Sequence, residues 1–294
     1  MSPTRTRRKT MRLLSAFLLL FIVKIGHGDK IDRVIFSLTT QSKRIQHIEH
    51  VLKHIVEQDL DDRVEYFVYL NVPPEIETLP SYMNETDRFR VHRMERDFGP
   101  ASKILGTLLH ERSHSTLIVY GDDDIVLPSN IVSMHYNAHL SYNSQGDVAF
   151  GTRKIRIGAD LGVDPAMDIL EATGTISIRA DVLHRVPSVF QMIEVDACRL
   201  SDDFWISYHL RLAHVEQRTL PCTYDFHRNR WPSKTCGSPF HVDPRISDIS
   251  ALSSVVVDVS GNMIPGQQGD WRVQLQRYAM CDRMIRSGEL VVES

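Results

Sequence analysis

The sequence has 294 residues, of which 42% are hydrophobic and 24% charged, and its formal net charge is −3. This length and composition are typical of a globular protein with one α/β domain or two small ones. A near-neutral charge gives no support for a nucleic-acid-binding protein, which normally has a strongly basic face. We therefore expect no nucleic-acid partner.

The N-terminus combines basic residues with a short apolar run. Five Arg and Lys residues up to Arg12 precede the apolar residues 13–23. This run is shorter than the about 20 residues that span a bilayer, and Gly26 and Gly28 place small residues where a signal peptidase cleaves. We expect residues 1–28 to be a signal peptide, or a signal anchor that holds the protein on the membrane. Either places residues 29–294 in the lumen of the secretory pathway, in the ER or Golgi.

The cysteines and a sequon agree with secretion. All four cysteines lie in the C-terminal third. Their even number predicts disulfides, with Cys222 and Cys236 as the favoured local pair. Asn84 begins the sequon Asn84-Glu85-Thr86 in a polar stretch, which predicts a glycosylated surface loop.

Strand and helix patterns alternate in the first half of the chain. Short apolar runs predict strands at 33–40, 64–70, 89–94 and 116–120, and helical periodicity predicts helices at 44–58 and from residue 101. This order indicates one nucleotide-binding half of a doubly wound sheet, over about residues 31–128. No Gly-x-Gly-x-x-Gly or Walker-type run occurs, which argues against an ordinary dinucleotide or P-loop site.

An acidic run, Asp122, Asp123 and Asp124, follows the strand 116–120. Adjacent carboxylates repel one another, so a cation or solvent has to compensate them. Ligands bind at the carboxyl ends of strands in open α/β sheets. A hard divalent ion takes one or two carboxylates together with water and phosphate oxygens. The run therefore predicts a Mg²⁺ or Mn²⁺ site, with a solvated acidic turn as the alternative.

A glycine turn opens the helix that precedes this strand. Gly99 and Pro100 form the turn, and Lys103 lies in the first turn of the helix. Such a turn exposes backbone N–H groups that suit a diphosphate, and Lys103 would add a positive charge. The alternative is an ordinary helix start with a surface lysine.

The second half of the chain, about 129–294, is less regular. We expect helices at 130–142, 180–190 (broken near Pro187) and 270–287, strands at 147–151 and 171–179, and a loop at 158–168. His227 or His241 could be a third metal ligand, although the sequence has 14 histidines and most are incidental.

A second acidic motif, Asp202 and Asp203, is expected at the start of a helix, where Ser201 or Asp202 is the N-cap. The helix dipole would lower the pKa of both carboxyls and keep a base ionised there. A plain cap with an acidic first turn is the alternative. Trp205, in the same helix, could stack on an acceptor sugar or be a core residue.

Three segments, in this order, resemble GT-A-fold glycosyltransferases: the turn 97–103 (DFGPASK), the strand with its acidic run, and the motif 201–207 (SDDFWIS). The likeness is closest to a family-2-like group with an Asp-aromatic-Gly-Pro-Ala-Thr-Lys turn and a DxD motif, and it covers about residues 34–212. It implies a single α/β domain whose doubly wound mixed sheet has a nucleotide-binding N-terminal half and an acceptor-binding C-terminal half. Ser102 stands where relatives have Thr, and Asp202 where they have Glu.

The resemblance also implies roles for individual residues. Asp122 and Asp124 match the metal-binding DxD positions, and Gly174 lies in the segment behind the donor sugar and acceptor. Asp203 matches the general base of inverting members, with Asp202 as the alternative base. The positions that match nucleotide-sugar contacts are Thr39, Thr40, Arg44, Gly99, Pro100, Lys103, Asp122 and Asp123.

The implied activity is a metal-dependent transfer of a sugar from a nucleoside-diphosphate sugar, with UDP or GDP, to a hydroxyl of a glycan, glycoprotein or glycolipid. A separate carboxylate base predicts inversion at the anomeric carbon. The alternatives are a retaining glycosyltransferase, a nucleotidyltransferase on the same sheet, and a non-catalytic glycan-binding protein.

Overall fold

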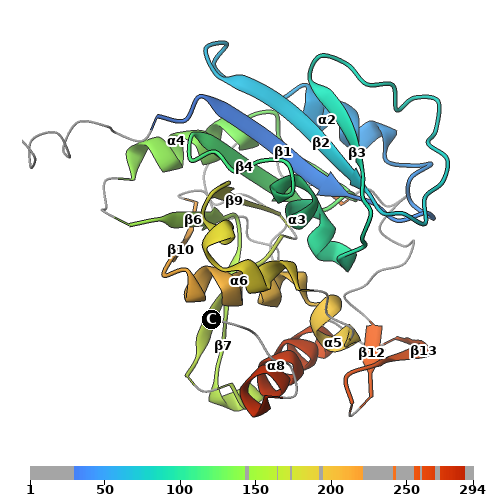
Figure 1. The fold of residues 1–294 in the computed structure, drawn as a ribbon, viewed down its shortest axis with the longest axis vertical. Helices are drawn as coiled ribbons and strands as arrows, with labels where there is room; N and C mark the ends of the chain where they lie inside the picture. The colour runs from blue at the N-terminus through green and yellow to red at the C-terminus, as the bar shows by residue number, and fades with distance from the viewer. Residues whose placement is uncertain are drawn as a thin grey trace, which may run out of the picture. The chain divides into compact units, whose positions relative to one another are not determined.

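The computed structural model describes residues 30–142, 146–163, 165–172, 174–191, 195–220, 241–242, 255–258, 260–268 and 272–288. The chain divides into two units, Met1–Lys30 and Ile31–Ser294. The second unit is an α/β fold (Figure 1). Within the ranges given, no helix has the length and apolar character that crossing a membrane requires. The predicted leader, 1–28, lies outside the described residues.

A seven-stranded sheet forms the centre of the fold, in the order β10-β6-β9-β4-β1-β2-β3. Its strands are β1 (Arg33–Thr39), β2 (Glu65–Val72), β3 (Phe89–Arg93), β4 (Thr116–Gly121), β6 (Val148–Gly151), β9 (Thr175–Arg179) and β10 (Glu216–Thr219). β9 is antiparallel to both of its neighbours, β4 and β6, and the other neighbouring strands are parallel. The predicted α/β class with a mixed, doubly wound sheet is confirmed.

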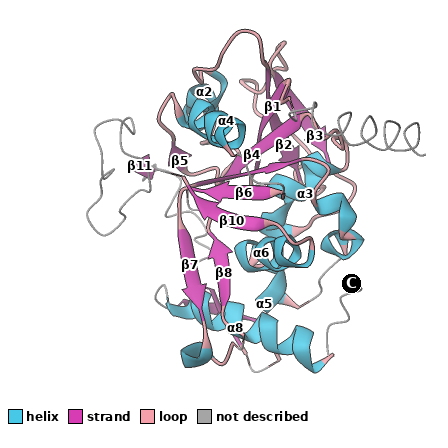
Figure 2. Cartoon of the chain, turned by 90° about the vertical axis from the view of Figure 1, so that its left-hand side faces the viewer, coloured by secondary structure: helices cyan, strands magenta, loops and turns pink. Residues whose placement is uncertain are grey.

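Helices cover both faces of this sheet. The four that pack on it are α2 (Glu49–Val56), α4 (Ile131–Ser141), α3 (Ser102–Leu108) and α6 (Asp202–Leu212). Side chains alternate across β4: Leu117 and Val119 pack with α2 and α4, whereas Ile118 and Tyr120 pack with α3 and α6. Figure 2 shows the two helix pairs on opposite sides of the sheet. Burial on both faces explains why β4 is a continuous apolar run.

Some predicted elements differ from the structure. The helix predicted at 44–58 begins only at Glu49, because residues 42–48 form turns. The predicted helix 180–190 is two short 3₁₀ helices that meet at Pro187. The loop predicted at 158–168 contains the start of β8 (Met167–Leu170), which pairs with β7 (Lys154–Ile157) outside the main sheet.

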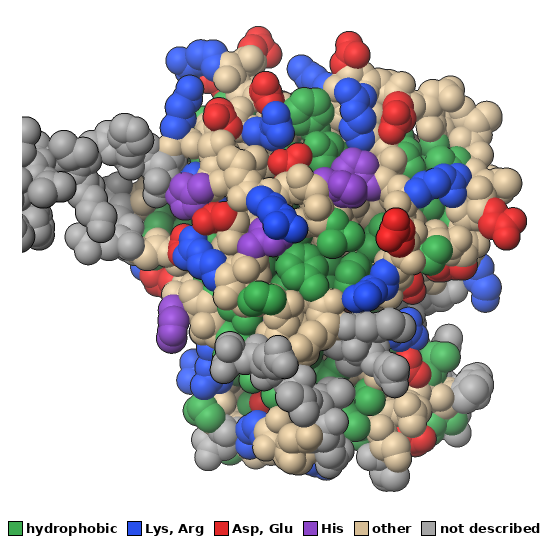
Figure 3. Space-filling model, in the orientation of Figure 1, with side chains coloured by type: hydrophobic (Ala, Val, Ile, Leu, Met, Phe, Trp, Pro, Cys, Tyr) green, Lys and Arg blue, Asp and Glu red, His purple; other side chains and the backbone are tan. Residues whose placement is uncertain are grey.

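The surface carries the predicted glycosylation site and charges of both signs. Asn84 is exposed in the loop before β3, as a sequon requires. On the face drawn in Figure 3, acidic and basic side chains are interspersed. Glycosylation of Asn84 stays a prediction.

A disulfide joins Cys198 in α5 (Asp196–Arg199) to Cys281 in α8 (Arg272–Ser287), 83 residues later. It ties the terminal helix to the short helix that precedes α6. The predicted partners Cys222 and Cys236, the other two cysteines of the chain, lie outside the described residues, and their pairing stays a prediction.

Gly106 marks the closest packing of α3 on the sheet. A Cβ added there would lie 2.6 Å from Cγ of Asn71. Asn71 is buried and donates hydrogen bonds of 3.0 Å to Ser37 Oγ and Thr107 Oγ1, so it has no room to move. We expect Gly106→Ala to destabilise the protein by about 1–3 kcal/mol, measured by urea unfolding. Gly158→Ala, where the nearest atom would be 3.4 Å away, is the control, and equal losses in both variants would contradict this packing.

Two buried histidines in α4 make stability depend on pH. Burial lowers the pKa of His135 and of His139 to about 3. Both rings hydrogen-bond Ser177, at 2.7 Å and 2.9 Å. Because the unfolded state takes up these protons below pH 6.5 and the folded state does not, stability falls as the pH decreases from there toward 3.

The expected loss is about 1.4 kcal/mol per pH unit for each histidine. His139→Gln keeps a donor for Ser177 but cannot titrate, so between about pH 8 and about pH 5.5 it should lose about 1.4 kcal/mol less than the wild type. His47→Gln, at an exposed position, should follow the wild type. A His139→Gln variant with the wild-type slope would show that this ring is protonated in the folded state.

Candidate active site

The acidic loop after β4 is fastened to the loop after β1. β1 and β4 are parallel neighbours, so their carboxyl ends lie at the same edge of the sheet. Asp123 accepts hydrogen bonds of 2.6 Å from Thr40 Oγ1 and from Arg44 Nη1, and its side chain is 6% exposed. Arg44 also lies 3.4 Å from a carboxylate oxygen of Asp124. Asp123 therefore holds the loop in place, while Asp122 and Asp124 on either side of it are more accessible.

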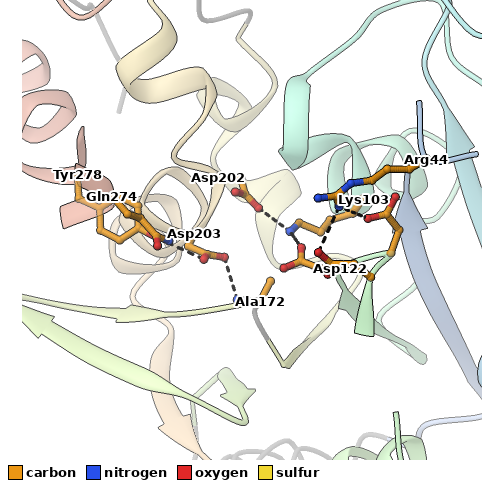
Figure 4. Close-up of polar contacts among 10 residues, drawn as sticks. Arg44, Lys103, Asp122, Ala172, Asp202, Asp203, Gln274 and Tyr278 are labelled. Atoms are coloured by element: carbon orange, nitrogen blue, oxygen red, sulfur yellow. Dashed lines mark hydrogen bonds and ion pairs between the residues drawn. The ribbon is translucent and has the colours of Figure 1, made fainter. Parts of the chain in front are cut away.

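Lys103 links the two acidic motifs. Its ammonium lies 2.5 Å from Asp122 and 2.9 Å from Asp202, and its side chain is only 4% exposed. Figure 4 shows Lys103 pointing into the space between these two carboxylates, which come from the loop after β4 and from the start of α6. The alternative of a surface lysine is wrong, because the lysine is the buried counter-ion of both motifs.

Asp203 has different hydrogen-bond partners from Asp202. One of its carboxylate oxygens accepts a 2.9 Å hydrogen bond from the Ala172 N–H, and the other accepts a 3.3 Å bond from the Tyr278 hydroxyl in α8. In Figure 4, Asp202 lies between the group formed by Arg44, Lys103 and Asp122 and the group formed by Asp203 and Tyr278. The neighbouring acids of the SDDFWIS motif thus face two different environments.

These environments raise carboxyl pKa values. Burial, with repulsion by Asp202, raises the pKa of Asp203 well above its usual range. Burial, with repulsion by Asp122 and Asp123, raises the pKa of Asp124 to about 7. The expectation that the dipole of α6 lowers the pKa of Asp203 is wrong, because loss of hydration and nearby acids outweigh the dipole.

A cavity of about 360 Å³ opens at this edge of the sheet, a volume within the range of ligand pockets. The C-terminal half contributes Arg199, Leu200 and Met263, which the sequence did not indicate. All eight residues assigned to the nucleotide-sugar line the cavity: Thr39, Thr40, Arg44, Gly99, Pro100, Lys103, Asp122 and Asp123.

Polar groups that were expected to be free for a nucleotide are bound within the protein. The Thr39 hydroxyl donates to the Asn71 carbonyl at 2.7 Å. The Thr40 hydroxyl and the Arg44 guanidinium donate to the Asp123 carboxylate. The Gly99 N–H donates to Asp97 Oδ1 at 2.8 Å, so it is not an open anion site. Gly99 has a φ of 62°, which explains a glycine at this turn. The expectation of exposed N–H groups is therefore wrong for Gly99.

Two residues assigned to the acceptor lie in the interior. Trp205 is 3% exposed, and its indole N–H donates to the Val189 carbonyl at 3.0 Å, so it is a core residue and not a platform for a sugar. Gly174 is buried against the end of β4, where a Cβ on Gly121 would lie 2.8 Å from its carbonyl oxygen.

The carboxylates of Asp122 and Asp124 suit a cation whose remaining ligands come from the substrate. Among the residues that the structure describes, no group of three His, Cys, Asp or Glu side chains could hold a metal ion. Asp122 and Asp124 are oxygen donors, and burial and repulsion by the neighbouring acids raise the pKa of Asp124 to about 7, an effect that a bound cation would oppose. Mg²⁺ and Mn²⁺ suit such a set, with phosphate oxygens and water in the remaining positions.

The histidines considered as further metal ligands lie late in the chain. His227 is outside the described residues. His241 is in β11 (His241–Val242), which pairs with β5 (Ile125–Val126) directly after the acidic loop. The backbone at position 241 thus lies beside this loop.

No protein-family model matches the sequence, and no curated protein matches it. Several solved structures are similar in fold. A 4-diphosphocytidyl-2C-methyl-D-erythritol synthase is 13% identical, with a TM-score of 0.41 over 70% of this chain and 94% of that one. HddC from Yersinia pseudotuberculosis is 10% identical, with a TM-score of 0.36 over 64% and 90%. The glycosyltransferase GlyE of Streptococcus pneumoniae TIGR4 is 11% identical, with a TM-score of 0.36 over 65% and 45%. These likenesses assign no substrate to this chain.

Proposed function

We propose that the protein is a metal-dependent, inverting glycosyltransferase that moves a sugar from a UDP- or GDP-sugar to a hydroxyl of a glycan or glycoconjugate. One observation carries this proposal: Lys103 joins the acidic loop of the cavity to Asp202, and the next residue, Asp203, is outside the cavity lining and is held by the Ala172 N–H. The arrangement provides a charged donor side and a separate carboxylate for an acceptor.

Asp203 suits the role of the base better than Asp202. The Asp202 carboxylate is held in an ion pair with Lys103, 2.9 Å away. Burial and like charges raise the pKa of Asp203, which increases its affinity for a proton. Both of its oxygens accept a hydrogen bond, and each retains a second lone pair.

In this mechanism the acceptor hydroxyl loses its proton to the Asp203 carboxylate while its oxygen bonds to the anomeric carbon of the sugar. The bond from that carbon to the phosphate oxygen breaks, and the nucleoside diphosphate leaves with the electron pair. Lys103 stabilises the negative charge on the leaving group by electrostatic attraction. A divalent ion at Asp122 and Asp124 would neutralise further charge on the phosphates.

The compartment is part of the proposal. The Cys198–Cys281 disulfide supports an oxidising environment, because disulfides are rare in the cytosol. We propose the lumen of the ER or Golgi, with the segment 1–28 as the targeting signal. Detection of the intact protein in a glycosylated, protease-protected fraction of secretory membranes would support this, and an unglycosylated cytosolic protein would contradict it.

A panel of nucleotide sugars tests the reaction. We expect the protein to release a nucleoside diphosphate from one donor with Mn²⁺ but not with EDTA. Asp124→Asn should abolish this release, and Asp160→Asn, at an exposed position away from the cavity, should retain it. The anomeric configuration of the product, determined by NMR, separates inversion from retention.

Two other outcomes would replace the proposal. Release of pyrophosphate from a nucleoside triphosphate and a sugar phosphate would identify a nucleotidyltransferase. Binding of a glycan without release from any donor would identify a non-catalytic glycan-binding protein.

A further inference from the structure

We propose that Tyr278 is a positioning residue for Asp203 and that the Cys198–Cys281 disulfide keeps it in place. The consequence for turnover rests on the proposed function, but the physical link between the two side chains does not. Tyr278 belongs to α8, in the part of the chain that the GT-A resemblance does not cover.

The hydroxyl of Tyr278 is oriented from both sides. Its ring is 1% exposed and stacks on Phe204 of α6, with ring centroids 6.1 Å apart. Gln274, one turn earlier in α8, donates its side-chain N–H to the hydroxyl oxygen at 2.5 Å. Because that oxygen accepts from Gln274, its own proton is available to Asp203, whose carboxylate oxygen lies 3.3 Å away.

Two donors therefore fix the plane of the Asp203 carboxylate. The Ala172 N–H binds one oxygen and Tyr278 binds the other. The backbone bond alone would leave the second oxygen without a partner in a buried site, where polar groups are normally paired. Tyr278 thus limits rotation of the group that would receive the acceptor's proton.

The disulfide attaches α8 to the start of this region. Cys281 is three residues after Tyr278, so the two side chains lie on the same face of α8. Its partner Cys198 is in α5, five residues before Asp203 in the sequence. The covalent bond therefore connects the helix that carries the tyrosine to the segment that leads into α6. Without it, α8 would be held on α5 and α6 by non-covalent contacts alone.

A stability cycle tests the link without any substrate. Tyr278→Phe removes only the hydroxyl and keeps the ring. We expect this change to raise the unfolding equilibrium constant several-fold in the wild type. In an Asp203→Ala background, the factor by which it raises this constant should be smaller by about threefold or more. Tyr66→Phe, which removes another buried hydroxyl bonded to the Ile55 carbonyl, should have the same effect in both backgrounds. Equal effects of Tyr278→Phe in the two backgrounds would overturn the proposal.

Turnover of the donor identified by the panel tests the positioning role. Tyr278→Phe should lower kcat about tenfold or more, as expected for a hydrogen bond to a charged group, and leave KM for the donor unchanged. Tyr66→Phe should change neither. If Tyr278→Phe turned over like Tyr66→Phe, the positioning role would be excluded. If the wild type turned over no donor, the proposed function would fail, while the stability cycle would still decide whether Tyr278 holds Asp203.

The disulfide is tested with Cys198→Ser and Cys281→Ser combined. The coupling is the ratio of the effects of Tyr278→Phe on the unfolding equilibrium constant without and with the Asp203→Ala change. If the disulfide keeps Tyr278 in position, this ratio should decrease about threefold or more in the serine background. Unchanged coupling would show that non-covalent contacts alone position α8, and would remove the disulfide from the proposal. If the pair of serines prevents folding, the same coupling is measured in the folded proteins with and without a reducing agent, with the same two outcomes.

Discussion

Replacing Asp203 with Asn should lower kcat by about 10²- to 10⁴-fold, the contribution typical of a general base. Asn has almost the same shape, and its side-chain oxygen can still accept the Ala172 N–H that now binds Asp203 at 2.9 Å. It cannot accept a proton from a hydroxyl. Because the charge at this position is not needed to bind the donor, the Kd of the nucleoside diphosphate should change little. Single-turnover kinetics and calorimetric titration with UDP or GDP measure these two quantities.

The pH dependence provides a second test of the same assignment. A base must be unprotonated, so activity should fall as the pH decreases through the pKa of Asp203. Burial places this pKa well above the usual range of a carboxyl, so the acidic limb of the kcat profile should lie at an unusually high pH. Asp124, whose pKa is raised to about 7, can contribute a limb of its own, so only the contribution of Asp203 should disappear from the residual activity of Asp203→Asn.

Asp202→Asn is the matched control for that variant. It removes the acid that pairs with Lys103, so we expect its main effects on donor binding and stability rather than on the proton transfer. If Asp202→Asn lost kcat and Asp203→Asn retained it, the two roles would be reversed and Asp202 would be the base.

The central strands could be predicted from the sequence because burial determines their composition. β1, β2 and β4 lie inside the sheet and are covered on both faces, so their residues are almost continuously apolar. β7 is different: in Lys154-Ile-Arg-Ile157 the two basic side chains are exposed, and within the described ranges the strand pairs with β8 alone. A strand with two exposed basic side chains has no comparable apolar run, which explains why the sequence does not predict β7.

The site was predictable only where chemistry is concentrated in short motifs. The acidic loop, Lys103 and the acids 202 and 203 were identified as separate candidates, but their connection through Lys103 depends on three distant segments. Tyr278 gave no signal, because one tyrosine in a predicted helix does not indicate which side chain it contacts. The disulfide spans 83 residues, and the number of cysteines alone does not determine their pairing. Contacts of this kind follow from the topology of the chain and not from local composition.

Replacing Lys103 with Met should have the largest effect on stability. Burial lowers the pKa of Lys103, but attraction by Asp122, Asp202 and Asp203 outweighs burial and raises the pKa well above its usual range. Met fills a similar volume without the charge, so these acids would lose their common counter-ion in a buried site. Breaking a buried ion pair on one side typically costs about 3–5 kcal/mol. Urea unfolding near neutral pH measures this loss.

The loss should depend on pH in a defined direction. Lys103 lowers the pKa values of Asp122 and Asp203, against the larger opposite effect of burial. Without it these pKa values rise further, and the folded state binds more protons than the unfolded state over a wider range. The free energy of unfolding of Lys103→Met should therefore fall more steeply than that of the wild type as the pH increases, and the two proteins should converge as the acids become protonated.

Lys53→Met separates this effect from the loss of a lysine as such. Lys53 is exposed on α2, so its replacement should change stability by no more than about 0.5 kcal/mol, at any pH. If Lys103→Met were no less stable than Lys53→Met, the acids would have another source of compensation, and Lys103 would not be the counter-ion that joins the two motifs. A large loss that is reduced by acid would instead show that this lysine allows the acidic loop and the start of α6 to lie side by side.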